Sequence, residues 1–274
     1  MTPIDERIDS RAGLDLNEFH AQYLEPEVPV VLADVVARWP AATKWSPQAL
    51  IERFGDYPIR ANYHPDAVMT AWKRMRADTT LGAVLGDHDP RTFVSANLFA
   101  ECPYLVDDID IPPIIRPDWI EDQARLWIQP RGNRTGLHWD SFSSLICVVR
   151  GRKRLLLFAP DQLELLYPCA VTGSKDFSMG SWSRLDVFAP DFAEYPAARA
   201  ARYHDVTIEE GETILVPRHW WHAVENLGTP TISVSFFVTP QGKSELTFYH
   251  DRRLIAGLSI KVGVLSGAHR RRAT

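Results

Sequence analysis

The sequence predicts a mainly β fold, an antiparallel barrel or jelly roll with flanking helices at its N-terminal and C-terminal ends. Short strand-like segments separated by turn residues dominate from Thr92 to about Val238. Helical patterns lie before and after this stretch and do not alternate with the strands, which argues against repeated βαβ units. With 274 residues, 45% of them hydrophobic and 11% aromatic, the chain is long enough to form one large β domain.

We expect the whole chain, residues 1–274, to form a single domain. Its N-terminal part, 28–91, should be a strand-helix elaboration, followed by a β core over 92–240. Residues 169–206 hold Gly, Ser, Pro and Asp between short apolar pieces, which predicts a loop insertion in that core. Residues 241–274 should form a helical segment and a tail.

The clearest N-terminal element is a helix that begins after Ser46. Serine is a favoured N-cap residue, Pro47 suits the first turn, and Gly55 is a typical helix terminator. Four further elements are expected in this part: a short helix over Leu16–Tyr23, a buried strand over Val28–Leu32, an extended segment over Tyr57–Tyr63, and an irregular stretch from His64 to Asp89 with a helix near Leu81–Leu85.

The core segments read as strands joined by tight turns. Arg150-Gly151-Arg152 separates two apolar segments and predicts a hairpin, and Glu210-Gly211 predicts a second turn. The expected strands are Leu126–Gln129, Leu145–Val149, Lys153–Phe158, Thr207–Glu209, Glu212–Val216 and Thr231–Val238, with a helical turn at Leu163–Tyr167.

Charge and cysteine content narrow the function classes. The net charge of −5 and the pI of about 6.0 do not favour a nucleic-acid or anionic-membrane binder. Three widely spaced cysteines without a CxxC pattern argue against a disulfide framework or a zinc cluster. No charged-then-apolar leader and no apolar run of membrane-spanning length occur in the sequence, so we expect a cytoplasmic protein with no nucleic-acid partner and no membrane contact.

Three residues are candidate metal ligands: His138, Asp140 and His222. Residues i and i+2 of a strand point to the same side, so an extended 137–141 segment would aim His138 and Asp140 at one ion. His222 follows the strand-like residues 214–217 and would come from a separate strand. Two histidines and one carboxylate on one face of a metal are typical of non-heme iron(II) oxygenases.

An isolated His-x-Asp pattern is weak evidence, because nine histidines and many aspartates make chance matches common. In the alternative interpretation His138 is a buried core histidine, Asp140 a turn residue and His222 a ring packed among tryptophans.

Lys153 strengthens the metal interpretation. Strand alternation places Lys153 with Leu155 and Leu157 on an apolar face, where a lysine is costly without a partner. Oxygenases of this kind commonly use 2-oxoglutarate, whose distal carboxylate needs a fixed cation, and Lys153 is the best candidate. Thr135 could reach the same carboxylate, although ordinary turn chemistry explains it equally well. Solvation of Lys153 within the basic 150–154 cluster is the alternative.

Several motifs together resemble the cupin-like JmjC hydroxylases, the branch similar to the hypoxia-inducible-factor asparaginyl hydroxylase. They are Gly136-Leu-His-Trp-Asp140, Val149-Arg-Gly-Arg-Lys-Arg154, Leu157-Phe-Ala-Pro-Asp-Gln162 with Leu166-Tyr-Pro168, and Pro217-x-x-Trp-Trp-His222. The similarity covers roughly residues 28–240, and the order and spacing of its motifs are specific.

The resemblance implies a double-stranded β-helix of the cupin/JmjC type with Fe(II) held by His138, Asp140 and His222. It also implies a 2-oxoglutarate cosubstrate bound by Lys153, with support from Thr135. Ser144 and Ser235 fall where several relatives carry asparagine near the cosubstrate, and Phe93 falls where relatives have a cosubstrate-binding tyrosine.

The sequence therefore predicts an Fe(II)- and 2-oxoglutarate-dependent oxygenase (a dioxygenase of the hydroxylase type, using O2). Its expected substrate is an unactivated C–H of a peptide or protein side chain, or of an amino-acid-like small molecule. The alternatives are a non-catalytic cupin that binds a metal or ligand, and a cupin metalloenzyme that does not use 2-oxoglutarate. The segment Glu245–Leu258 is a candidate surface for a homodimer, although its apolar pattern is weak.

Overall fold

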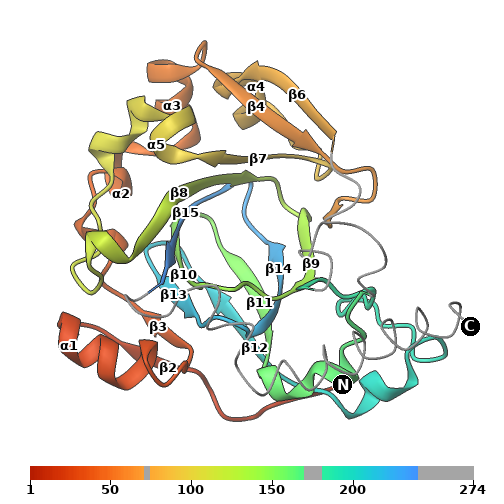
Figure 1. Cartoon of the computed structure of the whole chain (residues 1–274). Helices are drawn as coiled ribbons and strands as arrows, with labels where there is room; N and C mark the ends of the chain where they lie inside the picture. The colour runs from red at the N-terminus through yellow and green to blue at the C-terminus, as the bar shows by residue number, and fades with distance from the viewer. Residues whose placement is uncertain (71–74, 170–180, 240–274) are drawn as a thin grey trace, which may run out of the picture. The chain divides into compact units, whose positions relative to one another are not determined.

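The computed structural model describes residues 1–70, 75–169 and 181–239 (Figure 1). The described chain is mostly β and forms two large mixed sheets, so the jelly-roll prediction is confirmed. The strands are β1 Thr2–Pro3, β2 Asp9–Arg11, β3 Val30–Leu32, β4 Pro58–Tyr63, β5 Val68–Met69, β6 Met75–Thr80, β7 Thr92–Asn97, β8 Ile120–Gln129, β9 Arg134–His138, β10 Ser143–Arg150, β11 Lys153–Phe158, β12 Arg202–Ile208, β13 Thr213–Val216, β14 Trp221–Asn226 and β15 Thr231–Val238.

Short helices accompany these strands. The α-helices are α1 Leu16–Phe19, continued by a π-helical turn His20–Leu24, α2 Ala41–Lys44, α3 Pro47–Phe54, α4 Leu81–Gly86 and α5 Leu98–Glu101. The 3₁₀ helices are Val36–Arg38, Pro103–Asp108, Pro117–Trp119, Pro160–Leu165 and Pro196–Ala200. None of the helices in the described ranges is long and apolar enough to cross a bilayer.

Two sheets enclose the interior that carries the site. One has the strand order β1-β12-β11-β14-β9-β5 and the other the order β2-β3-β13-β10-β15-β8-β7-β4-β6. Apolar side chains from both sheets meet between them, among them Ile146 and Ile214 from the larger sheet with Leu155, Leu157 and Val224 from the smaller. Period-2 alternation directs these residues inward.

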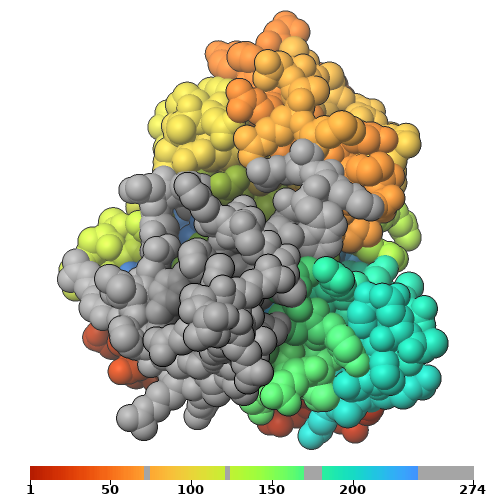
Figure 2. Space-filling view, turned by 45° about the vertical axis from the view of Figure 1, so that its right-hand side comes forward, coloured from red at the N-terminus to blue at the C-terminus, as the bar shows by residue number. Residues whose placement is uncertain are grey.

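The other face of the larger sheet packs against the N-terminal helices. Leu145, Cys147 and Phe236 point to this side, where they share a core with Trp45 and Leu50 of the α2–α3 region. Figure 1 shows helices α3, α4 and α5, orange to yellow, next to the β7-β4-β6 end of the larger sheet. Figure 2 shows the surface of the same orange to yellow part of the chain at the top of the view. The helices thus cover one face of the sheet and leave its other face for the interior.

Several predicted elements are confirmed. Helix α3 spans Pro47–Phe54, and the Ser46 hydroxyl accepts a hydrogen bond from the Ala49 amide as an N-cap. Strand β11 has the predicted bounds, and Gly151 adopts a φ of +74° in the turn before it. Adding a Cβ at Gly151 would bring it within 3.1 Å of the Gly228 Cα, so this turn also requires glycine for space.

Other elements differ from the prediction. The stretch from His64 to Asp89 contains β5 and the polar edge strand β6, because backbone pairing with β4 stabilises β6 without an apolar face. Strand β8 begins at Ile120, not Leu126. Strand β12 begins at Arg202, so the segment predicted as a loop over 169–206 includes five strand residues.

One further difference concerns a short segment, and one prediction falls outside the described residues. The helical turn predicted at Leu163–Tyr167 lies earlier in the chain, as the 3₁₀ helix Pro160–Leu165. The Glu245–Leu258 segment predicted as a dimer surface lies outside the described residues.

Candidate metal centre

Strand pairing brings the two candidate histidine ligands together. His138 is the last residue of β9 and His222 is the second residue of β14, and these antiparallel strands pair with His222 opposite His138. Their ring centroids lie 4.1 Å apart with a tilt of 50°. Because residues directly opposite on one sheet face the same side, both rings point into the interior.

Asp140 reaches the same place from outside the strand. Strand β9 ends at His138, so Asp140 lies beyond the paired strand on which the alternation argument relied. The Trp139 amide donates to the Ser181 carbonyl oxygen, and the His219 amide donates to the carbonyl oxygen of Asp140. These bonds secure the Asp140 segment to two neighbouring loops.

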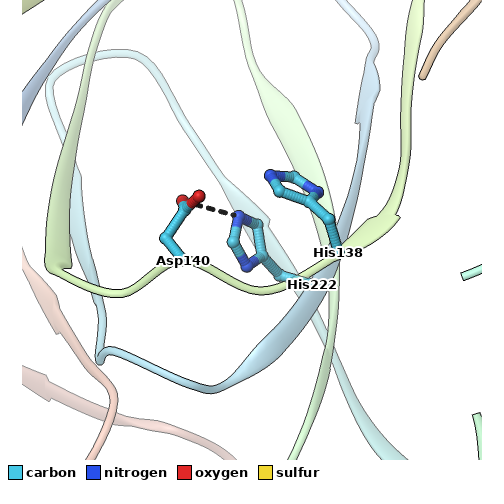
Figure 3. Close-up of side chains that lie close together, drawn as sticks. All are labelled: His138, Asp140 and His222. Carbon is cyan, nitrogen blue, oxygen red and sulfur yellow. Dashed lines mark ion pairs between the residues drawn. The ribbon is translucent and has the colours of Figure 1, made fainter. Parts of the chain in front are cut away.

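The three side chains form one compact cluster (Figure 3). Asp140 Oδ2 lies 3.7 Å from His222 Nε2, and one ligand atom from each residue lies within 4.8 Å of the others. This separation leaves room for one ion at ordinary ligand distances of about 2 Å from each atom. Two nitrogen donors and one oxygen donor on one side of an ion suit non-heme Fe(II) with open positions.

Backbone carbonyls orient both imidazoles. His138 Nδ1 lies 2.9 Å from the Gly136 carbonyl oxygen, and His222 Nδ1 lies 3.1 Å from the Trp220 carbonyl oxygen. A carbonyl oxygen can only accept, so each Nδ1 carries the proton and each Nε2 keeps its lone pair for a metal. Such outer hydrogen bonds are typical of histidines that ligate metals.

Burial favours the uncharged state of the two imidazoles. Desolvation lowers the pKa of His138 to about 4, and desolvation together with the nearby His138 lowers the pKa of His222 to about 4. Desolvation also raises the pKa of Asp140 above its ordinary value, an effect opposed by His222 and Arg125. Neutral imidazoles at neutral pH are the form that binds a metal ion.

Trp182 is a residue of the site that sequence reasoning missed. Its ring stacks on His138 with a centroid distance of 4.5 Å and an interplanar angle of 12°, and the two residues form an isolated β-bridge. Part of the predicted loop insertion therefore lies against the His138 end of β9. No local pattern marks Trp182, because its partner is 44 residues earlier in the chain.

Lys153 is the first residue of β11, and it lies at the end of the β11–β14 pair opposite to His222. In the pairing of β11 with β14, Leu157 stands opposite His222 and Lys153 opposite Asn226. Four residues of strand separate these rows, roughly 13 Å. The Lys153 side chain is buried, with 3% of the residue exposed, so the alternative of a solvated lysine is excluded.

Lys153 has one hydrogen bond and one aromatic neighbour. Its Nζ donates to Gln129 Oε1 over 2.6 Å and lies 5.9 Å from the centre of the Trp127 ring. Among the described residues no carboxylate pairs with it. Desolvation lowers its pKa to about 7, which reports the cost of a buried cation without an anion.

The other predicted cosubstrate residues occupy interior positions of different strands. Thr135 is buried on β9 opposite Val224, and Ser235 on β15 accepts a hydrogen bond from Trp127 Nε1 over 3.1 Å. Ser144 is buried on β10 opposite Phe237, away from the Lys153 row. Phe93 is fully buried on β7. Their predicted roles toward a cosubstrate stay predictions.

Two buried polar atoms near the Lys153 end lack a hydrogen-bond partner in the described part of the chain. They are Asn226 Oδ1, opposite Lys153, and Ser233 Oγ on β15. Buried polar atoms are normally satisfied by protein or bound solvent or ligand. The uncompensated ammonium of Lys153 and the Ser233 hydroxyl can both donate to a small polar anion at this end of the interior, whereas Asn226 Oδ1 can only accept from a bound donor.

The chain is similar to several curated proteins. It is 29% identical over 252 residues to "Lysine-specific demethylase JMJ30" of Arabidopsis thaliana, covering 87% of this chain and 56% of that protein. It is 34% identical over 151 residues to human "HSPB1-associated protein 1", covering 55% of this chain and 30% of that protein. It is 27% identical over 239 residues to "Jumonji C domain-containing protein 5" of Drosophila melanogaster, covering 81% and 57%.

These matched regions span between 30% and 57% of the relatives' own lengths. The similarity therefore concerns the β domain and its immediate flanks. Residues 16–244 match the protein family described as "Cupin-like domain", a stretch that contains all three candidate ligands and Lys153. On this match, and with JmjC proteins among its relatives, the chain belongs to the cupin-like domain family.

Proposed function

We propose that this protein is an Fe(II)- and 2-oxoglutarate-dependent oxygenase. Two features of one interior carry the proposal. His138, Asp140 and His222 form a cluster that could hold a metal ion, and the buried ammonium of Lys153, four strand residues away, has no carboxylate partner among the described residues. A five-carbon dicarboxylate with a keto acid at one end matches both features. The family assignment supports the same cofactors.

Each residue has a distinct part in this proposal. Iron with bound 2-oxoglutarate supplies oxidation of an unactivated C–H bond by O2, with release of succinate and CO2. His138, Asp140 and His222 would hold the metal from one side, and Lys153 would bind the distal carboxylate by a charge-assisted hydrogen bond. The apolar residues between these levels, such as Leu155 and Val224, would exclude water.

The geometry of the site defines a reaction class and not a substrate. We propose a C–H bond of a peptide or protein side chain, or of an amino-acid-like small molecule. Two relatives carry "demethylase" in their names. Removal of an N-methyl group also begins with oxidation of a C–H bond, so this site chemistry serves both reactions and the assay must look for both products.

The test measures consumption of 2-oxoglutarate and release of succinate by purified protein with Fe(II), ascorbate and O2. It adds panels of peptides, including methylated lysine peptides, and of free amino acids. Mass spectrometry then detects a gain of one oxygen atom or loss of a methyl group. We expect succinate release that rises with the correct substrate and is abolished in His222→Ala and Lys153→Met.

Two outcomes would contradict the proposal. Metal binding without 2-oxoglutarate binding or turnover on any panel would favour a non-catalytic cupin. Turnover that persists unchanged in Lys153→Met would indicate a cupin metalloenzyme that does not use 2-oxoglutarate. An exposed histidine on the segment after α4, changed as His88→Ala, is the matched control that should retain activity.

A further inference from the structure

A buried chain of hydrogen bonds runs from Lys153 to the backbone ahead of β7. Lys153 Nζ donates to Gln129 Oε1, Gln129 Nε2 donates to Asn133 Oδ1 over 2.8 Å, and Asn133 Nδ2 donates to the Pro90 carbonyl oxygen over 2.7 Å. Gln129 and Asn133 are both fully buried, with 1% and 0% exposed. The proposed function assigns no part to either residue.

The Pro90 carbonyl determines the direction of the whole chain. A carbonyl oxygen only accepts, so the amide nitrogen of Asn133 must face Pro90 and its oxygen must face Gln129. The Gln129 nitrogen must then donate to Asn133, which turns the Gln129 oxygen toward Lys153. The Asn133 backbone is secured as well, because its carbonyl oxygen accepts from Asn226 Nδ2 over 2.9 Å. The oxygen of Gln129 therefore faces Lys153, and neither side-chain amide can flip without breaking its hydrogen bond to the other.

One acceptor leaves Lys153 with two donors. A lysine ammonium has three N–H groups, and Gln129 takes one of them. The indole of Trp127 lies beside the same ammonium, and its Nε1 is engaged by Ser235. The two remaining N–H groups are the ones available to a carboxylate in the interior.

We propose that Gln129 is a positioning residue of the cosubstrate site. Its oxygen anchors one N–H of Lys153, aims the other two at the distal carboxylate of the 2-oxo acid, and keeps the ammonium form favourable by accepting from it. The proposal rests on the proposed function. It also links the cosubstrate site to the N-terminal elaboration, since Pro90 ends the segment that precedes β7.

The first test measures 2-oxoglutarate affinity by calorimetry, with Mn(II) in place of iron so that no turnover occurs. Gln129→Glu places a carboxylate on Lys153 that competes with the ligand, so we expect affinity to fall about a hundredfold or more. Gln129→Met removes the acceptor while keeping the size, and should cost about tenfold. Gln22→Glu makes the same charge change at an exposed position and should leave affinity unchanged.

Mn(II) affinity in the absence of 2-oxoglutarate is the check on folding, because the metal ligands lie four strand residues away from the Lys153 row. A purely structural role for Gln129 would weaken metal and 2-oxoglutarate binding together. The inference requires metal affinity within about twofold of wild type while 2-oxoglutarate affinity falls.

The second readout is the pH profile of 2-oxoglutarate binding. The interior neighbours of Lys153 are uncharged: Trp127 and Gln129 from β8, Ile208 from β12 and Asn226 from β14. Arg125, four positions before Gln129, is the charged residue on the interior face of β8 among the side chains that the structure describes. Wild-type affinity should fall as the pH rises above about 7, where Lys153 loses its proton in the ligand-free protein.

Loss of the Gln129 acceptor in Gln129→Met should move this decrease in 2-oxoglutarate affinity to lower pH, because the charged form of Lys153 is then less favourable. Gln129→Met and Gln129→Glu proteins that bind 2-oxoglutarate within about twofold of wild type, with the same pH profile, overturn this inference alone. Wild-type protein that binds Mn(II) but no 2-oxoglutarate overturns the proposed function, and this inference falls with it.

Discussion

His222 on β14 stands directly opposite His138 at the end of β9, and this register places their imidazole rings 4.1 Å apart. Both rings belong to adjacent strands of one sheet, so the backbone ladder itself sets their separation. Asp140 is the exception, because it reaches the cluster from a loop secured by backbone hydrogen bonds to Ser181 and His219.

Removal of His222 should abolish tight metal binding. His222→Ala deletes one of three protein donors, so we expect affinity for Mn(II) or Co(II) to fall more than about a hundredfold, beyond the effect of losing an outer hydrogen bond. Calorimetric titration measures this loss. The exposed His88→Ala is the control, and equal affinity in both variants would show that the metal binds elsewhere.

Metal binding should stay constant over a wide pH range. The pKa values of His138 and His222 are lowered to about 4, so both imidazoles stay neutral well below the usual titration range of histidine near 6.5. Protons therefore compete with the metal for the two imidazoles only at lower pH. Titration between pH 5.5 and 8, roughly, should give a flat profile. A fall beginning near pH 7 would contradict this burial effect.

Replacement of Lys153 should stabilise the ligand-free protein. Desolvation lowers the pKa of Lys153 from 10.5 to about 7, so the folded state binds fewer protons than the unfolded state between these values. This cost is fully present below pH 7 and disappears as the pH rises toward 10.5. Lys153→Met should therefore raise the free energy of unfolding by up to about 5 kcal/mol at pH 7.

The same comparison has a built-in check. The stability difference between wild type and Lys153→Met should narrow as the pH rises from about 7 to 10, because the folded-state lysine is already neutral and protonation of the unfolded-state lysine becomes less favourable as the pH approaches its pKa of 10.5. Denaturant unfolding at several pH values measures it. A constant difference would mean that packing, and not charge, determines the effect.

Asp108 should be a stability determinant remote from the site. Its buried carboxylate accepts from Lys44 over 2.8 Å, from Trp45 Nε1 over 3.0 Å and from Arg53 over 3.2 Å. Asp108→Asn leaves these donors poorly paired and should cost about 2 kcal/mol, less than for a fully buried pair because Lys44 and Arg53 are partly exposed. Metal affinity should not change.

The pH dependence of this contribution follows from the pKa of Asp108. Desolvation raises that pKa, but the hydrogen bonds from Lys44, Trp45 and Arg53 outweigh it and hold the pKa below 3.8. The stabilisation is present above the ordinary pKa and is lost as the pH falls through the lowered one. Wild type and Asp108→Asn should thus converge in acid unfolding experiments, and divergence there would contradict the charge-based explanation.

The sequence predicted the elements whose signals are local. The Ser46 cap with Pro47 marked α3, and the Gly151 turn marked β11 and hence the inward position of Lys153. Polar strand β6 was missed because an edge strand held by backbone pairing needs no apolar alternation. Asp140 was expected on a strand because alternation describes side-chain direction but does not say where pairing ends.

By itself the sequence identified the candidate donor set, since His138, Asp140, His222 and Lys153 are the chemical types that the proposed iron and dicarboxylate would require. Tertiary structure alone decided that Trp182 stacks on His138 and that Gln129, oriented through Asn133 by the Pro90 carbonyl, is the acceptor for Lys153. The physical reason is that hydrogen bonds and ring contacts act over a few ångströms in space. The folded strands bring together atoms that lie tens of residues apart in the chain.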